Sequence, residues 1–246
     1  MKYWSRHSAV SAIRNADPLT DRAAGKRGVM ESVKIPIHDI ELNGDLVCPE
    51  GATGLVVFAH GSGSSRLSPR NQFVAREIQA ARIGTLLFDL LTAAEESKDA
   101  TSGHWRFDIP LLTRRLVMAT QWLMEQKVGR TLGIGYFGSS TGAAAALVAA
   151  AQLGSSIQAV VSRGGRPDFA GDALSQVTAP TLLIVGEFDE GVLGLNRSAY
   201  SRINAEKQFS VVPRATHLFE EPGALEEVSV LARDWFRAHL RAPRRM

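Results

Sequence analysis

The stretch TLGIGYFGSSTGAAAAL, at residues 131–147, indicates how the chain folds and where its chemistry lies. Its apolar start, residues 131–137, predicts a buried strand, and the alanine-rich run over 142–153 predicts a helix. Ser140 stands between them, at the centre of the pentapeptide GSSTG. Such a strand–turn–helix unit holds its central residue in strained backbone geometry, so the neighbours two positions away must lack bulk. The pattern predicts Ser140 as a nucleophile, and a glycine-rich packing turn is the structural alternative.

Strand and helix patterns alternate on both sides of this stretch. The strand candidates are continuous apolar runs, which are typical of parallel strands covered on both faces. The sequence predicts strands at residues 55–59, 83–90, 131–137, 157–162, 180–186 and 208–212, and helices at 71–82, 109–126, 142–153, 191–204 and 224–240. We therefore expect an α/β fold with a mostly parallel central sheet and helices on both of its faces.

Two shorter strand candidates precede this alternation, at residues 32–37 and 40–47. The second contains Asn43-Gly44, a dipeptide typical of tight hairpin turns, so the pairing register stays open. Residues 1–28 show no clean period, and we expect a loosely ordered N-terminal extension whose role the sequence does not indicate. Residues 29–246 have the length of one large α/β domain.

Composition limits the classes of function. Apolar residues make up 45% of the 246 residues and charged residues 22%, as in soluble globular proteins. No apolar run reaches the ~18 residues of a membrane helix, and the first residues lack the apolar centre of a signal peptide. The net charge of +3 is small, so we expect no nucleic-acid partner. Cys48 is the one cysteine of the chain, which fits a reducing compartment, and we expect a cytoplasmic protein.

Three further segments match a known family together with the pentapeptide. They are VFAHGSGSS at 57–65, TLLIVGEFD at 181–189 and RATHLF at 214–219. Over about residues 33–240, the chain resembles the α/β-hydrolase superfamily, and within it the small lidless enzymes similar to dienelactone hydrolase. Chains that look like this one sometimes accompany phosphoribosyltransferase-like domains. The resemblance implies a hydrolase without a large cap domain that needs no metal and no organic cofactor.

The resemblance also implies roles for residues of this chain. Ser140 matches the nucleophile, His217 the general base, and Asp189 the acid that orients the histidine. Their order along the chain, Ser…Asp…His, is the order expected of this fold. The backbone N–H groups of Ser62 and Thr141 match the two donors of the oxyanion hole.

Other acids and histidines compete for the last two roles. Glu187 and Glu190 flank Asp189 and are the rival acids. His60 follows a predicted strand, where we expect a structural hydrogen-bonding role rather than a catalytic one. The remaining histidines lie in the N-terminal tail, at a hairpin, in the loop after residue 90 and in the last helix: His7, His38, His104 and His239.

The chain departs from the family pattern at the nucleophile. Dienelactone hydrolases hold cysteine in the elbow, whereas this chain holds serine, and Cys48 lies far away in the sequence. We therefore expect a small-molecule ester substrate, an ordinary carboxylic ester rather than a dienelactone. The segment between Ser162 and Pro180 is short, which favours an open cleft. A thioesterase or peptidase on the same residues, and a catalytically silent binding module, stay open as alternatives; the oligomeric state is not predicted.

Two cationic residues are candidates for binding the substrate. Arg163 follows the strand 157–162, at the edge where open α/β sheets place their sites. It either binds a carboxylate or phosphate of the substrate or forms an ion pair that fixes a loop. His104 lies in the loop 91–105 and is a candidate for lining the pocket, although the role of that loop is not predicted.

Overall fold

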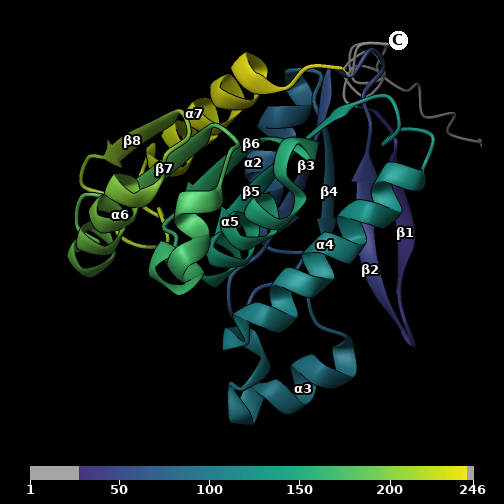
Figure 1. Ribbon diagram of the computed structural model, residues 1–246, viewed down its shortest axis with the longest axis horizontal. Coiled ribbons are helices and arrows are strands. Elements are labelled where there is room, and N and C mark those ends of the chain that lie inside the picture. Colours follow the sequence, from purple (N-terminus) through teal and green to yellow (C-terminus); the bar gives the residue numbers. More distant parts are fainter. Residues whose placement is uncertain (1–27, 243–246) are drawn as a thin grey trace, which may run out of the picture.

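One eight-stranded sheet forms the centre of the molecule (Figure 1). The computed structural model describes residues 28–242, and in it the strand order is β1-β2-β4-β3-β5-β6-β7-β8. β2 pairs antiparallel with β1 and β4, and all later pairs are parallel. The strands are β1 (Met30–Ile37), β2 (Ile40–Val47), β3 (Gly54–Ala59), β4 (Gly84–Phe88), β5 (Gly133–Ser139), β6 (Ile157–Arg163), β7 (Thr181–Gly186) and β8 (Lys207–Val212).

Helices cover both faces of this sheet (Figure 1). On one face lie α4 (Ile109–Glu125) and α5 (Thr141–Leu153), and on the other lie α2 (Pro69–Ala80) and α7 (Ala224–His239). Each face of the sheet has its own apolar core. Buried alanines along α5 let this helix lie close to the sheet and to α4. The predicted α/β fold is confirmed, and the bounds predicted for the strands and helices of the alternating region agree within two residues.

The hairpin between β1 and β2 turns at His38 and Asp39 rather than at the Asn-Gly pair. His38 has a φ of 53°, the left-handed conformation that a tight turn needs. β2 runs without interruption through Gly44, where a Cβ would lie 3.1 Å from the side chain of Val33 on the neighbouring strand. Close packing between strands therefore accounts for this glycine, and the local turn signal at Asn43-Gly44 is overridden.

The segment 91–105, whose role the sequence left open, contains the helix α3 (Ala93–Ser102). Thr92 and Glu95 form a capping box, in which each side chain accepts the backbone N–H of the other residue. This spacing of threonine and glutamate was a signal for the helix in the sequence. In Figure 1, α3 projects beyond the edge of the sheet at which β4 ends.

Between β6 and β7 the chain forms only η3 (Pro167–Gln176), which packs on α5 and on α6 (Glu190–Arg202). Within residues 28–242, no cap domain covers the carboxyl edge of the sheet. Within the same range, no helix is both long and apolar enough to span a bilayer, and no group of three or more side chains is arranged to hold a metal ion. The cytoplasmic location stays a prediction.

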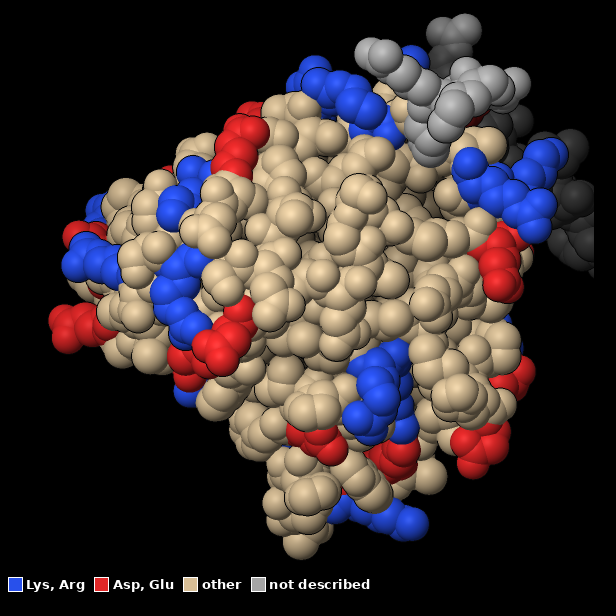
Figure 2. All heavy atoms as spheres, viewed as in Figure 1, with Lys and Arg blue, Asp and Glu red and all other residues tan. Residues whose placement is uncertain are grey.

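Charged side chains on the face in Figure 2 are mixed in sign and lie around a broad uncharged centre. The predicted N-terminal extension falls on residues 1–27, outside the described range, apart from its last residue, Gly28.

Candidate active site

Ser140 lies at the sharp turn between β5 and α5. Its backbone has φ 49° and ψ −120°, a conformation that costs a residue with a Cβ about 1–3 kcal/mol. A Cβ at Gly138 would lie 2.4 Å from Cα of Ala143, and one at Gly142 would lie 2.2 Å from the carbonyl oxygen of Ala59. Larger side chains at these two positions would force the turn apart. This is the geometry that the pentapeptide predicts for its central serine.

The other candidate residues follow neighbouring strand ends. Ser139, the last residue of β5, pairs with Arg163, the last residue of β6, and β7 and β8 end opposite each other at Gly186 and Val212. Because parallel strands end at one edge of the sheet, the loops after β5, β7 and β8 meet there. These loops contain Ser140, Asp189 and His217.

Asp189 and His217 are in direct contact. Oδ2 of Asp189 lies 2.6 Å from Nδ1 of His217, and the carboxylate does not cap α6 although Asp189 precedes that helix. A carboxylate on Nδ1 leaves Nε2 free to exchange a proton with another group. The rival acids lie elsewhere, since Glu187 accepts the amide N–H of Arg214 at 2.7 Å and Glu190 is exposed in the first turn of α6.

Gly164 connects His217 to the serine. The amide N–H of Ser140 donates to the carbonyl oxygen of Arg163 at 3.2 Å. At the next residue, a Cβ on Gly164 would lie 3.5 Å from Cε1 of His217, so the imidazole lies against the backbone that holds the serine. Within the described residues, no hydrogen bond joins the Ser140 hydroxyl to His217. Such contacts are often long until a substrate is bound.

The loop after β3 meets the start of α5. The amide N–H of Ser62 donates to Oγ1 of Thr141 at 3.0 Å, and a Cβ on Gly61 would lie 3.0 Å from Cβ of Ser140. The N–H of Thr141 belongs to the first turn of α5, where amides have no acceptor within the helix. The two candidate oxyanion donors therefore lie close together beside Ser140, and the hydroxyl of Thr141 accepts a hydrogen bond from one of them.

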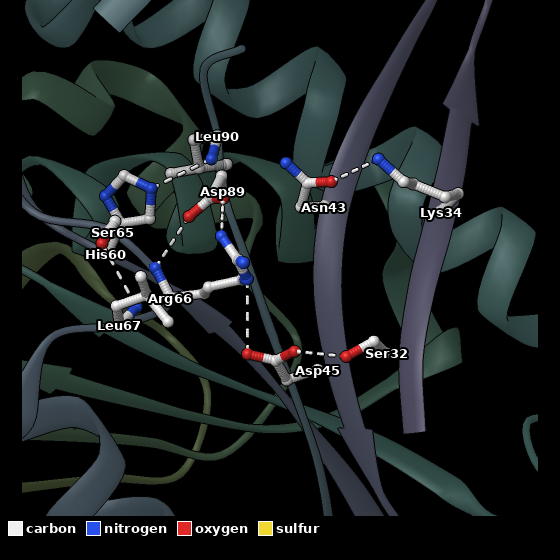
Figure 3. Close-up of polar contacts among 10 residues, drawn as sticks. All are labelled: Ser32, Lys34, Asn43, Asp45, His60, Ser65, Arg66, Leu67, Asp89 and Leu90. Atoms are coloured by element: carbon white, nitrogen blue, oxygen red, sulfur yellow. Dashed lines mark hydrogen bonds and ion pairs between the residues drawn. The ribbon is translucent and has the colours of Figure 1, made fainter. Parts of the chain in front are cut away.

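Arg66 anchors this loop, a role that no motif in the sequence indicates (Figure 3). Its amide donates to Oδ1 of Asp89 at 2.9 Å, and its guanidinium donates to Oδ2 of the same carboxylate. Nε of Arg66 forms an ion pair with Asp45 at 3.3 Å. One side chain thus joins the loop after β3 to β2 and to the end of β4. No local pattern indicates such contacts, because Asp89 lies 23 residues further along the chain.

His60 is buried at the start of the same loop and has the expected structural role (Figure 3). Its Nε2 accepts the N–H of Leu90 at 2.9 Å, and its Nδ1 lies 3.0 Å from the carbonyl oxygen of Gly61. These contacts require a neutral ring with its proton on Nδ1. Burial lowers the pKa of His60 below its ordinary value of 6.5, so the ring stays neutral around neutral pH.

A small cleft opens next to Ser62 and Thr141, although Ser140 is not in its lining. Arg106, from η1 (Trp105–Phe107), lines the cleft and donates from Nε to the buried carboxylate of Asp99 at 2.6 Å. His104 is exposed on the turn after α3 and does not line this cleft. Arg106, rather than the expected His104, is therefore the cation that residues 91–107 contribute to the cleft.

Arg163 is buried beside the candidate site, with 7% of its surface exposed. Its guanidinium carbon lies 5.6 Å from the centre of the Phe219 ring. Among residues 28–242, no ion pair joins Arg163 to a carboxylate, so the described residues do not form the loop-fixing ion pair that was the alternative interpretation.

No protein-family model matches the chain. Two curated proteins of Mycobacterium tuberculosis, from strains CDC 1551 and H37Rv, are each 54% identical to it over 213 residues and have the provisional name phosphoribosyl transferase. The match covers 87% of this chain and 47% of each of those proteins. The chain therefore spans about half the length of the curated relatives it matches.

Solved structures match over nearly all of their length. A dienelactone hydrolase of Anabaena variabilis is 53% identical, with a TM-score of 0.86 over 87% of this chain and 100% of that one. Est1E of Butyrivibrio proteoclasticus, at 16% identity and a TM-score of 0.71, covers 84% of this chain and 98% of its own. The Pyrococcus furiosus esterase Pf2001 is 17% identical, with a TM-score of 0.67 over 96% of this chain and 99% of its own. Est1E and Pf2001 share the fold of this chain. Because it is 53% identical to the Anabaena protein, the chain belongs to the dienelactone hydrolase family of the α/β-hydrolases.

Proposed function

We propose that this chain is a serine hydrolase that cleaves small carboxylic esters through an acyl-enzyme. The observation that carries the proposal is the 2.6 Å contact between Asp189 and His217, next to a serine with a φ of 49°. The Anabaena relative, at 53% identity, is named a dienelactone hydrolase, which supports the same reaction class.

In the first half of the proposed reaction, the Ser140 hydroxyl attacks the carbonyl carbon of the ester. His217 accepts the hydroxyl proton on Nε2, while Asp189 holds the proton on Nδ1 and stabilises the imidazolium that forms. The carbonyl electron pair moves onto oxygen, where the amides of Ser62 and Thr141 donate to it. Each such donor contributes about 3 kcal/mol to the transition state. His217 then gives its proton to the departing alcohol, and the acyl group stays on the serine.

In the second half, water takes the place of the alcohol. His217 accepts a proton from the water, the oxygen attacks the acyl carbon, and the same two amides stabilise the second oxyanion. When this intermediate collapses, the acid leaves and Ser140 regains its proton from His217. The residues already named thus account for every proton transfer of both halves.

Substrate size follows from the surroundings of the serine. The segment between β6 and β7 is a short 3₁₀ structure, and the cleft beside Ser62 and Thr141 is small. Among the described residues, no cap encloses a tunnel for a long acyl chain, which favours small acyl groups over lipid chains. A thioester reacts through the same steps and is included among the test substrates.

The first test is the hydrolysis of p-nitrophenyl acetate and butyrate, together with labelling by a fluorophosphonate. For Ser140→Ala we expect kcat to fall by about four orders of magnitude or more and the label to disappear. The fold is kept, because alanine places the same Cβ in the strained turn. The matched control is Ser139→Ala in the same turn, whose hydroxyl donates to Asn71 at 3.3 Å and which should lose less than about tenfold.

Two outcomes would contradict the proposal. If the folded wild type neither turns over these esters or a thioester nor takes the label, the binding-module alternative is favoured. If Ser139→Ala loses as much activity as Ser140→Ala while its melting temperature is unchanged, the nucleophile is wrongly assigned.

A further inference from the structure

The buried guanidinium of Arg163 has a second arginine as its neighbour. The side chain lies on the sheet face that α2 and α7 cover, against the ring of Phe219. Arg70, the second residue of α2, is close enough for its charge to lower the pKa of Arg163. The N-terminal end of α2 adds a further positive partial charge to this region.

Three N–H groups of this pair are buried without an acceptor among residues 28–242. They are Nε and Nη1 of Arg163 and Nε of Arg70. The only carboxylate that either side chain meets in this range is Glu220, which lies 2.7 Å from Nη1 of Arg70 at the surface. Glu220 follows Phe219 in the chain, so the Arg70–Glu220 pair is next to the buried guanidinium.

An unpaired buried charge is costly, because water no longer solvates it and no counter-charge replaces the water. Burial, followed by the charge of Arg70, lowers the pKa of Arg163 to about 10. The guanidinium therefore still has its charge at neutral pH, beside a second positive charge. Buried donors without a partner are rare in native folds, and a bound ion or water is one explanation for them.

We propose that Arg163 and Arg70 bind a small oxyanion, a carboxylate or a phosphate group, beside Ser140. The planar donor sets of two guanidinium groups match the oxygens of such an anion. The backbone of Arg163 adjoins the proposed catalytic centre, because its carbonyl accepts the amide of Ser140 at 3.2 Å and the following Gly164 contacts His217. The anion is either an acidic group of the substrate, which rests on the proposed function, or a free ion.

Access to the buried donors passes by Glu220. The side chains of Arg70 and Glu220 are 34% and 62% exposed, so their ion pair is weakly held and can open. An arriving anion takes the place of the Glu220 carboxylate on Arg70 and reaches Arg163 behind it. Glu220 therefore competes with the anion, and removing its charge should tighten binding.

The test measures binding without catalysis. Melting temperatures are recorded with sodium phosphate and with sodium acetate, at constant ionic strength. We expect phosphate to raise the melting temperature of the wild type by about 2–4 °C, and to raise that of Glu220→Gln further. Arg70→Met, a change at a partly exposed position, and Arg163→Met should both lose the rise. Arg202→Met is the control, since Arg202, the last residue of α6, pairs with Asp172 of η3, and the variant should keep the rise.

Kinetics then separate the two sources of the anion. If the anion belongs to the substrate, mono-p-nitrophenyl succinate should have a kcat/KM about tenfold above that of p-nitrophenyl butyrate in the wild type but not in Arg70→Met. Phosphate should then inhibit competitively. If a free ion binds, phosphate raises the melting temperature while the ratio of the two esters stays near one.

The proposal is overturned if neither anion raises the melting temperature of the wild type or of Glu220→Gln and the acidic ester has no advantage. Buried water would then satisfy the three donors. A protein that hydrolyses no ester but shows the Arg70-dependent rise would keep the anion site and lose the proposed function.

Discussion

Arg66 and Arg163 both lie at the edge of the sheet that holds Ser140, but within the described residues only Arg66 has carboxylate partners. Arg66 is balanced by two carboxylates, Asp45 and Asp89, and joins the loop of Ser62 to two strands. Arg163 is more deeply buried and has no carboxylate partner in the described range. A paired buried charge fixes a loop, whereas an unpaired one keeps its donors available to a ligand. The difference separates a region built to hold backbone amides in place from a region built to receive an anion.

The largest expected effect concerns the contact between Asp189 and His217, which lies at the same edge of the sheet as the two arginines. Asp189→Asn should lower kcat by about 10⁴-fold, because an amide can hold His217 in the tautomer whose Nε2 is already protonated. Glu187→Gln is the matched control and should change kcat by less than about threefold. Steady-state hydrolysis of p-nitrophenyl acetate measures both. Equal losses in the two variants would mean that the 2.6 Å contact of Asp189 with His217 has no catalytic role.

The second prediction tests Arg66, the arginine with two carboxylate partners. Arg66→Met leaves Asp45 and Asp89 without a counter-charge and should lower the free energy of unfolding by about 2–3 kcal/mol. It should also lower kcat about 10–100-fold and change KM less, because the displaced Ser62 amide acts mainly in the transition state. Urea unfolding and steady-state kinetics measure the two effects. Arg66→Lys, which keeps the charge, should recover part of both.

A loss of stability with kcat unchanged would make Arg66 a structural residue alone. The comparison with Arg163 would then concern folding rather than catalysis.

A smaller effect concerns the hydrogen bond between the two donors of the proposed oxyanion hole, Ser62 and Thr141. Thr141→Val removes the acceptor of the Ser62 amide at nearly constant volume and should lower kcat about tenfold. Thr141→Ser keeps the hydroxyl and should stay close to wild type. A rise in kcat for the valine variant would instead show that the hydroxyl competes with the substrate oxyanion for that amide.

The smallest effect is on pH dependence. Because burial lowers the pKa of His60 below 6.5, the unfolded chain binds the proton more readily than the native state. Stability is therefore complete above about pH 6.5 and falls as the pH drops toward the lower, folded-state pKa. Between pH 7.5 and 5.5 the wild type should lose about 1 kcal/mol more than His60→Gln, whose amide oxygen can replace Nε2. Urea unfolding at pH 7.5 and 5.5 measures the difference. If the wild type and His60→Gln lose the same free energy of unfolding, the protonation of His60 does not contribute to the loss of stability in acid.

Local patterns predicted most of the fold. Continuous apolar runs located β3 to β8, and helical spacing located α2, α4, α5, α6 and α7, because both patterns depend on neighbours within a few residues. The capping box of Thr92 and Glu95 was equally local and would have located α3. The Asn43-Gly44 signal failed, because contacts with the neighbouring strands decided the conformation of that glycine.

The sequence by itself determined the strained turn at Ser140, the order of strands and helices, and the candidates Asp189 and His217, since each rests on a short motif at a strand end. Only the tertiary structure decided that Asp189 rather than Glu187 meets His217, and that Arg106 rather than His104 lines the cleft. It also decided that Arg66 has two carboxylate partners and Arg163 none. Charges far apart in the chain meet according to how strands and loops pack, and no local spacing encodes which of them will be paired.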